Sequence, residues 1–213
     1  NFGDRLRGTQ PPEKLFEAVD YLVERNADIV NMSLSAEIQL LGLKERIDRQ
    51  NGQGLFVVAA GNTNPQGRRL GLSPRYPASW GGESDRPNVV TVAATDNVGG
   101  KAAFSKCGDE VDLLSLGCTI TTIDNADTQV VDFGTSMAAA HVSFISSTLR
   151  ALGGTSMWPA RLKNRLIASA RYRRSFPTAN KDGYILDEIK AVSVTHDVIE
   201  VVSQQSGEAE LRF

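Results

Sequence analysis

The sequence is poor in the residues that carry metal and redox chemistry. Its 213 residues include two cysteines, two histidines and three methionines. Cys107 and Cys118 are too few for a disulfide framework and lack the paired spacing of a metal site, so one disulfide or two thiols both stay open. His141 and His196 are the only imidazoles. Chemistry that needs a histidine base must therefore use one of these two, or a group from outside the chain.

Charge of one sign, long apolar runs and phosphate-binding loops are also missing. The formal net charge is −2, with 25 acidic and 23 basic residues, so we expect no nucleic-acid partner. No apolar run approaches the ~20 residues that span a membrane, so we expect no membrane partner either. Neither a P-loop nor a G-x-G-x-x-G stretch occurs, which excludes the common nucleotide cradles. A hydrophobic share of 41% is typical of a globular protein with one sizeable core.

Helical and strand-like patterns alternate through the first half of the chain. We expect helices at 12–26 and 37–50, and strands at 28–35, 55–60 and 88–95. The runs LFVVAA and NVVTVAAT are continuously apolar and rich in β-branched residues, as in strands buried on both faces. This alternation predicts an α/β fold with three layers, in which helices flank a mostly parallel sheet.

The second half begins with a long loop at 61–87, of a length that is usually functional. Short strands are expected at 103–105, 111–115, 119–123 and 129–132, and helices at 136–152, 158–171 and 186–192. The tail after Asp197 has the pattern of a β-hairpin that turns near Ser206 and Gly207. We therefore divide the chain into a main domain at 1–192 and a C-terminal hairpin extension at 193–213.

A serine opens the alanine-rich helix pattern in the stretch VDFGTSMAAAHVSF, residues 131–144. The G-x-S-x-G elbow of many hydrolases is absent, because Ala138 occupies its last position. At the first turn of a helix, Ser136 can act as a nucleophile, since free N–H groups and the helix dipole stabilise an oxyanion there. The alternative is that Thr135 or Ser136 only caps the helix.

Asn62 follows a strand predicted to be buried, in the stretch VVAAGN. A side-chain amide at the carboxyl end of a parallel strand points into the crevice where such sheets bind ligands. The amide can donate an N–H to an oxyanion, or it can form a local turn with its own backbone. The residues alone leave both interpretations open.

Three separated motifs, in order, carry a family resemblance. They are N-M-S-L at 31–34, A-A-G-N at 59–62 and G-T-S-M-A at 134–138, the last followed by His141. Together they resemble the subtilisin-like serine proteases, or subtilases, over roughly residues 10–192. The resemblance implies the subtilisin-like fold, without its N-terminal strands, and peptide-bond hydrolysis through an acyl-enzyme.

The resemblance also implies roles for individual residues. Ser136 is the implied nucleophile, and Asn62 donates to the oxyanion together with the Ser136 backbone N–H. The implied substrate-binding residues are Ser33, Leu34, Ser35, Ala60, Gly61 and Thr135. Within this set, Ser33 to Ser35 lie along the peptide, and Ala60 and Gly61 face them across the pocket for P1, the residue before the cleaved bond.

The sequence departs from the family pattern at three positions near these motifs. Ser35 stands where the family usually has glycine, and Ala140 where it usually has proline. Leu114 to Gly117 replaces an A-P-G turn. None of these changes removes a catalytic group, so they indicate a divergent member whose specificity does not follow from the family.

The base half of the active site is absent from the sequence. The family carries its catalytic Asp and His upstream of the first helix, and neither motif occurs here. His141 lies five residues after Ser136, about 140° around a helix from it, so we expect a structural role. His196 precedes the tail hairpin and is expected to be a surface residue.

Three explanations of the missing base follow. The chain can be a fragment of a longer protease, one subunit of a split protease completed by a second chain, or a non-catalytic peptide-binding or structural module. The first two require an upstream segment or partner chain that supplies Asp and His. The resemblance favours a secreted or extracytoplasmic location. It requires no cofactor, and although calcium is common in the family, no acidic cluster here assigns a calcium site.

Overall fold

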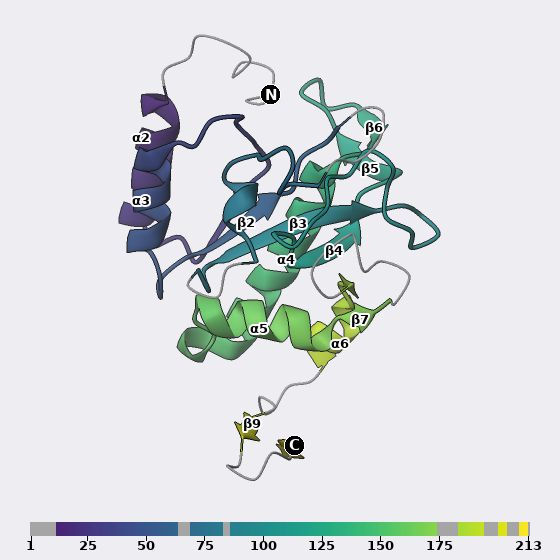
Figure 1. Cartoon of the computed structure of the whole chain (residues 1–213). Helices are drawn as coiled ribbons and strands as arrows, with labels where there is room; N and C mark the ends of the chain where they lie inside the picture. The colour runs from purple at the N-terminus through teal and green to yellow at the C-terminus, as the bar shows by residue number, and fades with distance from the viewer. Residues whose placement is uncertain are drawn as a thin grey trace.

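A six-stranded, mostly parallel sheet forms the centre of the protein in the computed structural model (Figure 1). The structure describes residues 12–63, 69–82, 86–173 and 183–193, with the backbone of 200–203 and 209–212. The strand order is β1-β2-β3-β4-β8-β7. These strands are β1 (Ile29–Met32), β2 (Leu55–Ala59), β3 (Val89–Thr95), β4 (Leu113–Leu116), β8 (Tyr184–Ile185) and β7 (Arg171–Tyr172). Pairing is parallel from β1 to β8, and β7 joins β8 in the antiparallel sense.

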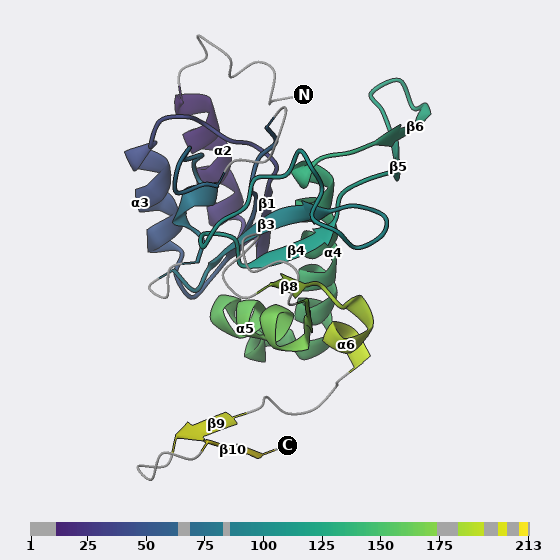
Figure 2. The same cartoon turned by 45° about the vertical axis from the view of Figure 1, so that its right-hand side comes forward.

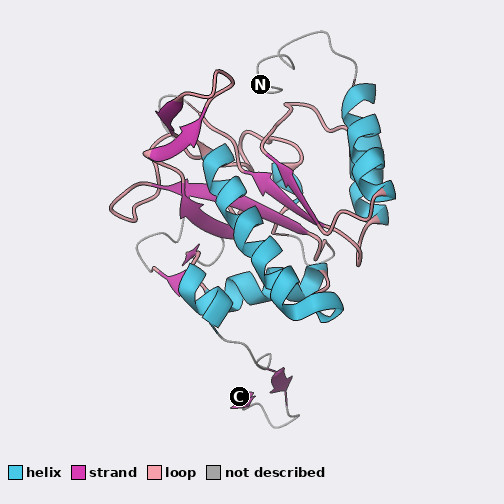
Figure 3. Cartoon of the chain, turned by 180° about the vertical axis from the view of Figure 1, so that it is seen from behind, coloured by secondary structure: helices cyan, strands magenta, loops and turns pink. Residues whose placement is uncertain are grey.

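Helices cover both faces of the sheet, as the α/β expectation requires (Figures 1 and 3). On one side lie α2 (Glu13–Glu24) and α3 (Leu41–Arg49). On the other lie α4 (Thr135–Gly153), α5 (Pro159–Ser169) and α6 (Glu188–Ser193). Seen from behind in Figure 3, α4 crosses the sheet diagonally, and it contacts β1, β2, β3 and β4.

Alternation along β2 divides the core into two halves. Phe56 and Val58 pack with the residues of α2 and α3, whereas Leu55, Val57 and Ala59 pack with those of α4 and α5. All residues of β2 and β3 are buried. The continuous apolar runs at 55–60 and 88–95 were therefore correctly predicted to be buried on both faces.

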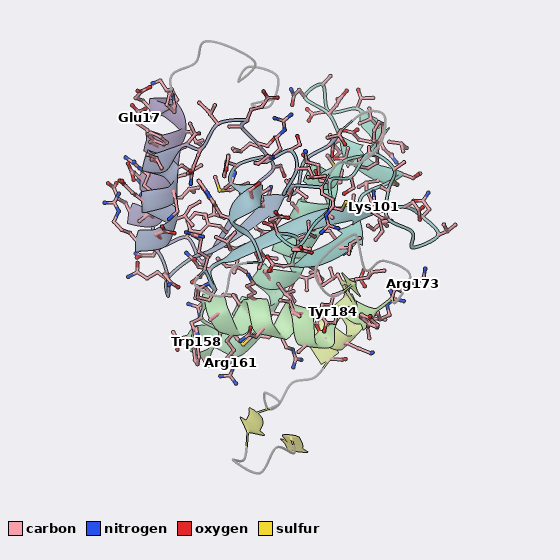
Figure 4. All side chains as sticks on the ribbon, in the orientation of Figure 1. Glu17, Lys101, Trp158, Arg161, Arg173 and Tyr184 are labelled. Carbon is pink, nitrogen blue, oxygen red and sulfur yellow. The ribbon has the colours of Figure 1, made fainter. Side chains whose placement is uncertain are left out.

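Smaller elements complete the described chain. Short 3₁₀ turns η1 (Ala78–Trp80) and η2 (Gly154–Ser156) join larger elements. At the start of α5, the Arg161 guanidinium lies 5.5 Å from the ring centroid of Trp158, and both residues are labelled in Figure 4. Hairpin β5 (Ile120–Ile123) and β6 (Gln129–Asp132) extends from the body beside the start of α4 (Figure 2).

Strands β9 (Glu200–Ser203) and β10 (Ala209–Arg212) pair in the antiparallel sense, which confirms the expected tail hairpin. Its predicted turn at Ser206 and Gly207 lies outside the described residues. Helix α6 ends at Ser193, next to the predicted domain boundary at 192/193, and that boundary stays a prediction.

Two local expectations were wrong. The second helix begins at Leu41 and not at 37, because Ala36 pairs with Tyr76 and holds the preceding segment extended. No strand forms at 103–105, where Ser105 makes only an isolated bridge to Asn62. In both places a long-range backbone pairing decides the conformation, which a local pattern does not encode.

Candidate active site

The amide of Asn62 and the start of α4 meet at the carboxyl end of β2, although they lie 73 residues apart in sequence. Asn62 Oδ1 accepts hydrogen bonds from the Thr135 backbone N at 3.0 Å and from Thr135 Oγ1 at 2.9 Å. The Gly61 backbone N donates to Thr135 Oγ1 at 3.1 Å. Thr135 is therefore the residue that joins the Gly61–Asn62 turn to the helix.

These contacts orient the Asn62 amide. Because two donors hold Oδ1, the Nδ2 group must face the opposite way. Within the described part of the chain, Nδ2 has no acceptor, and the Asn62 side chain is exposed. The amide therefore offers its N–H groups to a ligand, and the alternative of a purely local turn does not describe its contacts.

Gly134 is the N-cap of α4, and no side chain caps this helix. The alternative in which Thr135 or Ser136 serves only as a cap is therefore wrong. Gly134 has a φ of +152°, and a Cβ at this position would lie 3.1 Å from Asn62 Nδ2 and 3.7 Å from the Ser136 backbone N. Both donors thus border one small space that the missing side chain leaves open.

Ser136 occupies the first turn of α4, next to this space. Its backbone N–H is among those that lack an intrahelical acceptor, and the positive end of the helix dipole lies there. Its side chain is half-buried, and among the described residues its hydroxyl has no hydrogen-bond partner. A side-chain amide and a free backbone N–H therefore border one open space, and Ser136 carries its hydroxyl on the same helical turn. Two such donors can stabilise an oxyanion.

The segment after β1 forms a wall beside Ser136. Ser33 Oγ donates to the Ser136 carbonyl oxygen at 3.1 Å and accepts from Asn31 Nδ2 at 2.9 Å. Ser143 Oγ, about two turns further along the same face of α4, donates to Asn31 Oδ1 at 3.1 Å. Leu34 packs on the core, and Ser35 is exposed. The structure thus brings Ser33 to Ser35 next to the serine, as the family resemblance implied.

Ala60 and Gly61 lie across from this segment. Ala60 is buried, and its N–H donates to the Val92 carbonyl oxygen at 2.8 Å. Gly61 has a φ of +99° and is partly exposed. All eight residues predicted for the site therefore gather around the carboxyl ends of β1 and β2 and the N-terminus of α4.

His141 makes contacts that point away from Ser136. Its Nδ1 lies 3.0 Å from Ser115 Oγ on β4, and its Nε2 lies 3.5 Å from Glu188 Oε1 on α6. The side chain is 32% exposed, so it lies at the rim between α4, β4 and α6 and is not fully in the core. These contacts support the structural role expected for His141. His196 lies outside the described residues.

The described residues do not meet the requirements of a metal site, a disulfide or a membrane-spanning helix. No group of three or more His, Cys, Asp or Glu side chains there could hold a metal ion. Cys107 and Cys118 do not form a disulfide, which decides between the two alternatives left open by the sequence. No helix among the described residues is long and apolar enough to cross a membrane.

The family model of the subtilases matches residues 9–189. The chain belongs to the subtilase family. It is 30% identical over 151 residues to the thermostable alkaline protease of Halalkalibacterium halodurans, covering 70% of this chain and 37% of the relative. Subtilisin from Bacillus pumilus and subtilisin E from Bacillus subtilis are each 28% identical over 160 residues, or 74% of this chain. The match covers 54% and 39% of those two relatives, so the subtilase chain spans about half their length or less.

Solved structures show the same fold. A structure of the subtilase cytotoxin assembly superposes with a TM-score of 0.75 at 21% identity, covering 88% of this chain and 66% of that one. A cold-adapted subtilisin-like serine proteinase superposes with a TM-score of 0.69 at 24% identity, covering 85% and 63%. The fold class inferred from the sequence is therefore confirmed.

The sequence indicated Gly134 as a small residue that lets a substrate carbonyl approach, and a side chain there would indeed fill the space between the two donors. Sequence reasoning missed the pair Arg75 and Lys106, whose side chains lie against Gly61. No local signal could have revealed them, because they come from separate loops.

Proposed function

We propose that this chain carries the nucleophile and the oxyanion site of a subtilisin-like serine endopeptidase. One observation carries the proposal: Asn62 Nδ2 and the Ser136 N–H border the same open space beside Gly134. Membership of the serine peptidase family agrees with this geometry. The substrate we propose is a polypeptide, in agreement with the peptidase family and with the segment Ser33 to Ser35 that lies beside the serine.

The proposed reaction is an acyl transfer. Ser136 Oγ attacks the carbonyl carbon of the peptide bond, and its proton passes to a base. The carbonyl oxygen becomes an oxyanion that accepts hydrogen bonds from Asn62 Nδ2 and the Ser136 N–H. The C–N bond then breaks, the amine leaves with the proton, and water hydrolyses the ester. These steps need no cofactor.

The base must come from elsewhere, because no described residue is placed to take the Ser136 proton. His141 is held by Ser115 and Glu188. We propose that an upstream segment or a second chain supplies the catalytic His and Asp. Among the described strands, β1 pairs only with β2, so its other edge can accept a further strand.

A fluorophosphonate probe tests this proposal, because it labels only an activated serine. We expect rapid labelling of Ser136 in a longer form that includes the upstream region, and slow labelling in the 213-residue chain alone. Ser136→Ala is the blank. Equal labelling rates in the two forms would contradict the proposal that the catalytic base comes from outside this chain.

A non-catalytic peptide-binding module is the second candidate, favoured by the absence of a base among the described residues. It predicts no labelling in either form, together with measurable binding of an extended peptide along Ser33 to Ser35.

The location of the protein is proposed from its relatives. One of them, 29% identical over 143 residues, is the minor extracellular protease of Bacillus subtilis, and we propose an extracellular location here too.

Replacing Asn62 by Ala is expected to lower kcat of the longer form by about 10²–10³, with KM little changed. That magnitude was measured in a subtilisin, a relative of this chain. The substitution removes the side-chain donor but leaves the Ser136 N–H in place. Thr135→Val is the companion variant, because it keeps the side-chain shape while removing the Oγ1 bond that orients Asn62. A kcat unchanged by both variants would remove Asn62 from the mechanism.

Replacing His141 by Gln is expected to leave the labelling rate of Ser136 in the longer form within about twofold. The variant weakens contacts to Ser115, whose side chain is buried, so the free energy of unfolding should fall by ~1 kcal/mol. Probe kinetics and urea denaturation of the same sample separate the two effects. Loss of labelling in a sample that unfolds like the wild type would contradict a structural role.

A further inference from the structure

Two basic side chains lie against the bare side of Gly61. A Cβ placed on Gly61 would be 3.4 Å from Lys106 Cδ and 3.7 Å from Arg75 Cγ, and apart from its chain neighbours no other described residue has an atom within 4 Å. We propose that the subtilase site selects an acidic P1 side chain, with Arg75 and Lys106 as its recognition residues. This inference rests on the proposed function, since it assigns the substrate of that same site.

Arg75 contacts both segments that flank Ser136, because its Cγ lies beside Gly61 and its guanidinium pairs with Glu37, just after the segment 33–36. The neighbouring Tyr76 exchanges backbone hydrogen bonds with Ala36, at 2.8 and 2.9 Å. These bonds place residue 75 beside the C-terminal end of the segment 33–36. The Arg75 backbone N donates to Ser79 Oγ at 3.0 Å, which fixes the turn. A side chain that enters between Ser35 and Gly61 must therefore approach the guanidinium.

The present partner of Arg75 is easily replaced. Arg75 Nη1 lies 2.6 Å from Glu37 Oε1, but the Glu37 side chain is 80% exposed, whereas that of Arg75 is 24% exposed. An ion pair with so exposed a carboxylate contributes little, because water and salt screen it. A substrate carboxylate, held from its other side by the peptide backbone, can take the place of Glu37 on the more buried guanidinium.

Lys106 adds positive potential behind Arg75. Its side chain is fully buried, its backbone N donates to the Gly61 carbonyl oxygen at 3.0 Å, and its Nζ donates to the Ser73 carbonyl oxygen at 2.8 Å. An ammonium in a low-dielectric surrounding acts over a longer distance than one in water. The ammonium therefore favours a negative charge near Gly61 even without direct contact.

The nearby carboxylates are directed elsewhere. Glu110 places its oxygens beside Gly71 and Gly108, and Asp109 pairs with Arg69 at 3.1 Å. Among the described residues, Glu37 is thus the carboxylate that faces Arg75. A substrate carboxylate therefore has to displace only this exposed side chain, among the described carboxylates, to reach the Arg75 guanidinium.

The test measures binding and cleavage separately. The peptides are Ala-Ala-Pro-X amides for binding and the matching p-nitroanilides for cleavage, with X as Glu, Gln, Lys or Phe. Binding is measured by calorimetry on the longer form carrying Ser136→Ala, so that it does not depend on hydrolysis. We expect the Glu peptide to bind about tenfold more tightly than the Gln peptide, as for a charge-assisted hydrogen bond.

Variants identify the residues responsible. Arg75→Gln should bring the Glu/Gln ratio close to one, and Arg75→Glu should favour the Lys peptide. Glu37→Gln should strengthen binding of the Glu peptide, since it removes the competing carboxylate. Arg46→Gln is the matched control. This variant also removes one positive charge and one ion pair, but the pair is with Asp20 on α2 and not at Gly61. The variants are made at Arg75 and not at Lys106, because Lys106→Met would change a fully buried side chain and could disturb folding.

The outcomes separate this inference from the proposed function. Cleavage without preference for Glu, or a Glu/Gln ratio that Arg75→Gln leaves unchanged, overturns the inference while the peptidase stands. Tighter binding of the Glu peptide without cleavage of any peptide supports the inference and favours the non-catalytic module.

Discussion

Replacing Ser136 by Ala is expected to lower kcat of the longer form by about 10⁶-fold, the loss measured when the nucleophile of a subtilisin, a relative, is removed. The reason is that Ser136 supplies the only protein atom that bonds to the substrate carbonyl carbon in the proposed reaction. The oxyanion donors remain in the variant, so residual hydrolysis of ~10³–10⁴ over water is expected to persist.

The measurement is p-nitroanilide hydrolysis by the longer form and by its variant, with substrate binding followed in parallel. Ser147→Ala is the matched control, because Ser147 lies on the same helix and its hydroxyl bonds, within the described part of the chain, only to the Ser143 carbonyl oxygen, 2.9 Å away. The control should stay within about twofold of the wild type. If the variant at 136 kept more than a tenth of the activity, another nucleophile would have to be sought.

Replacing Lys163 by Met is expected to lower the free energy of unfolding by about 3–5 kcal/mol. Lys163 Nζ lies 2.9 Å from Asp112 Oδ1 and donates to the Val89 carbonyl oxygen at 2.7 Å. Both side chains are at most 10% exposed. The variant leaves the Asp112 carboxylate buried, and the described donors that still hold it are the backbone N–H groups of Thr91 and Gly82.

The same variant should show a pH dependence of defined sign. Burial raises the pKa of Asp112 from its ordinary value of 3.8, while Lys163 opposes this shift by its charge and its hydrogen bond. Without Lys163 the folded-state pKa rises further, so the folded form keeps its proton to a higher pH than the unfolded form. Stability is then lost as the pH rises through that interval. The deficit against the wild type should be smaller at pH 4 than at pH 8.

Urea denaturation followed by tryptophan fluorescence measures both effects. Asp112→Asn combined with Lys163→Met should recover at least about half of the loss, because no uncompensated charge remains. Lys14→Met is the surface control, since its pair with Glu17 is more than two-thirds exposed and should contribute less than about 1 kcal/mol. A Lys163 variant as stable as that control would show that the buried pair does not stabilise the fold.

The sequence by itself determined the architecture. Continuous apolar runs indicate strands buried on both faces, and their alternation with helical patterns indicated that helices provide the two covering layers. Periodic apolar residues set α2, α4 and α5 to within a few residues of their observed ends. The motifs at 31–34, 59–62 and 134–138 predicted the family, and the family model confirms it. These signals are local, and each can be recognised within one segment.

Only the tertiary structure decided how these segments act together. The orientation of the Asn62 amide depends on Thr135, and the space between the two donors depends on Gly134. His141 contacts Ser115 and Glu188, which lie on other elements, so the helical pattern around His141 does not predict these contacts. Arg75 and Lys106 reach Gly61 from separate loops. Hydrogen bonds and charges act over a few ångströms in space, whatever the distance along the chain, so their partners are fixed only once the sheet has brought its loops to one edge.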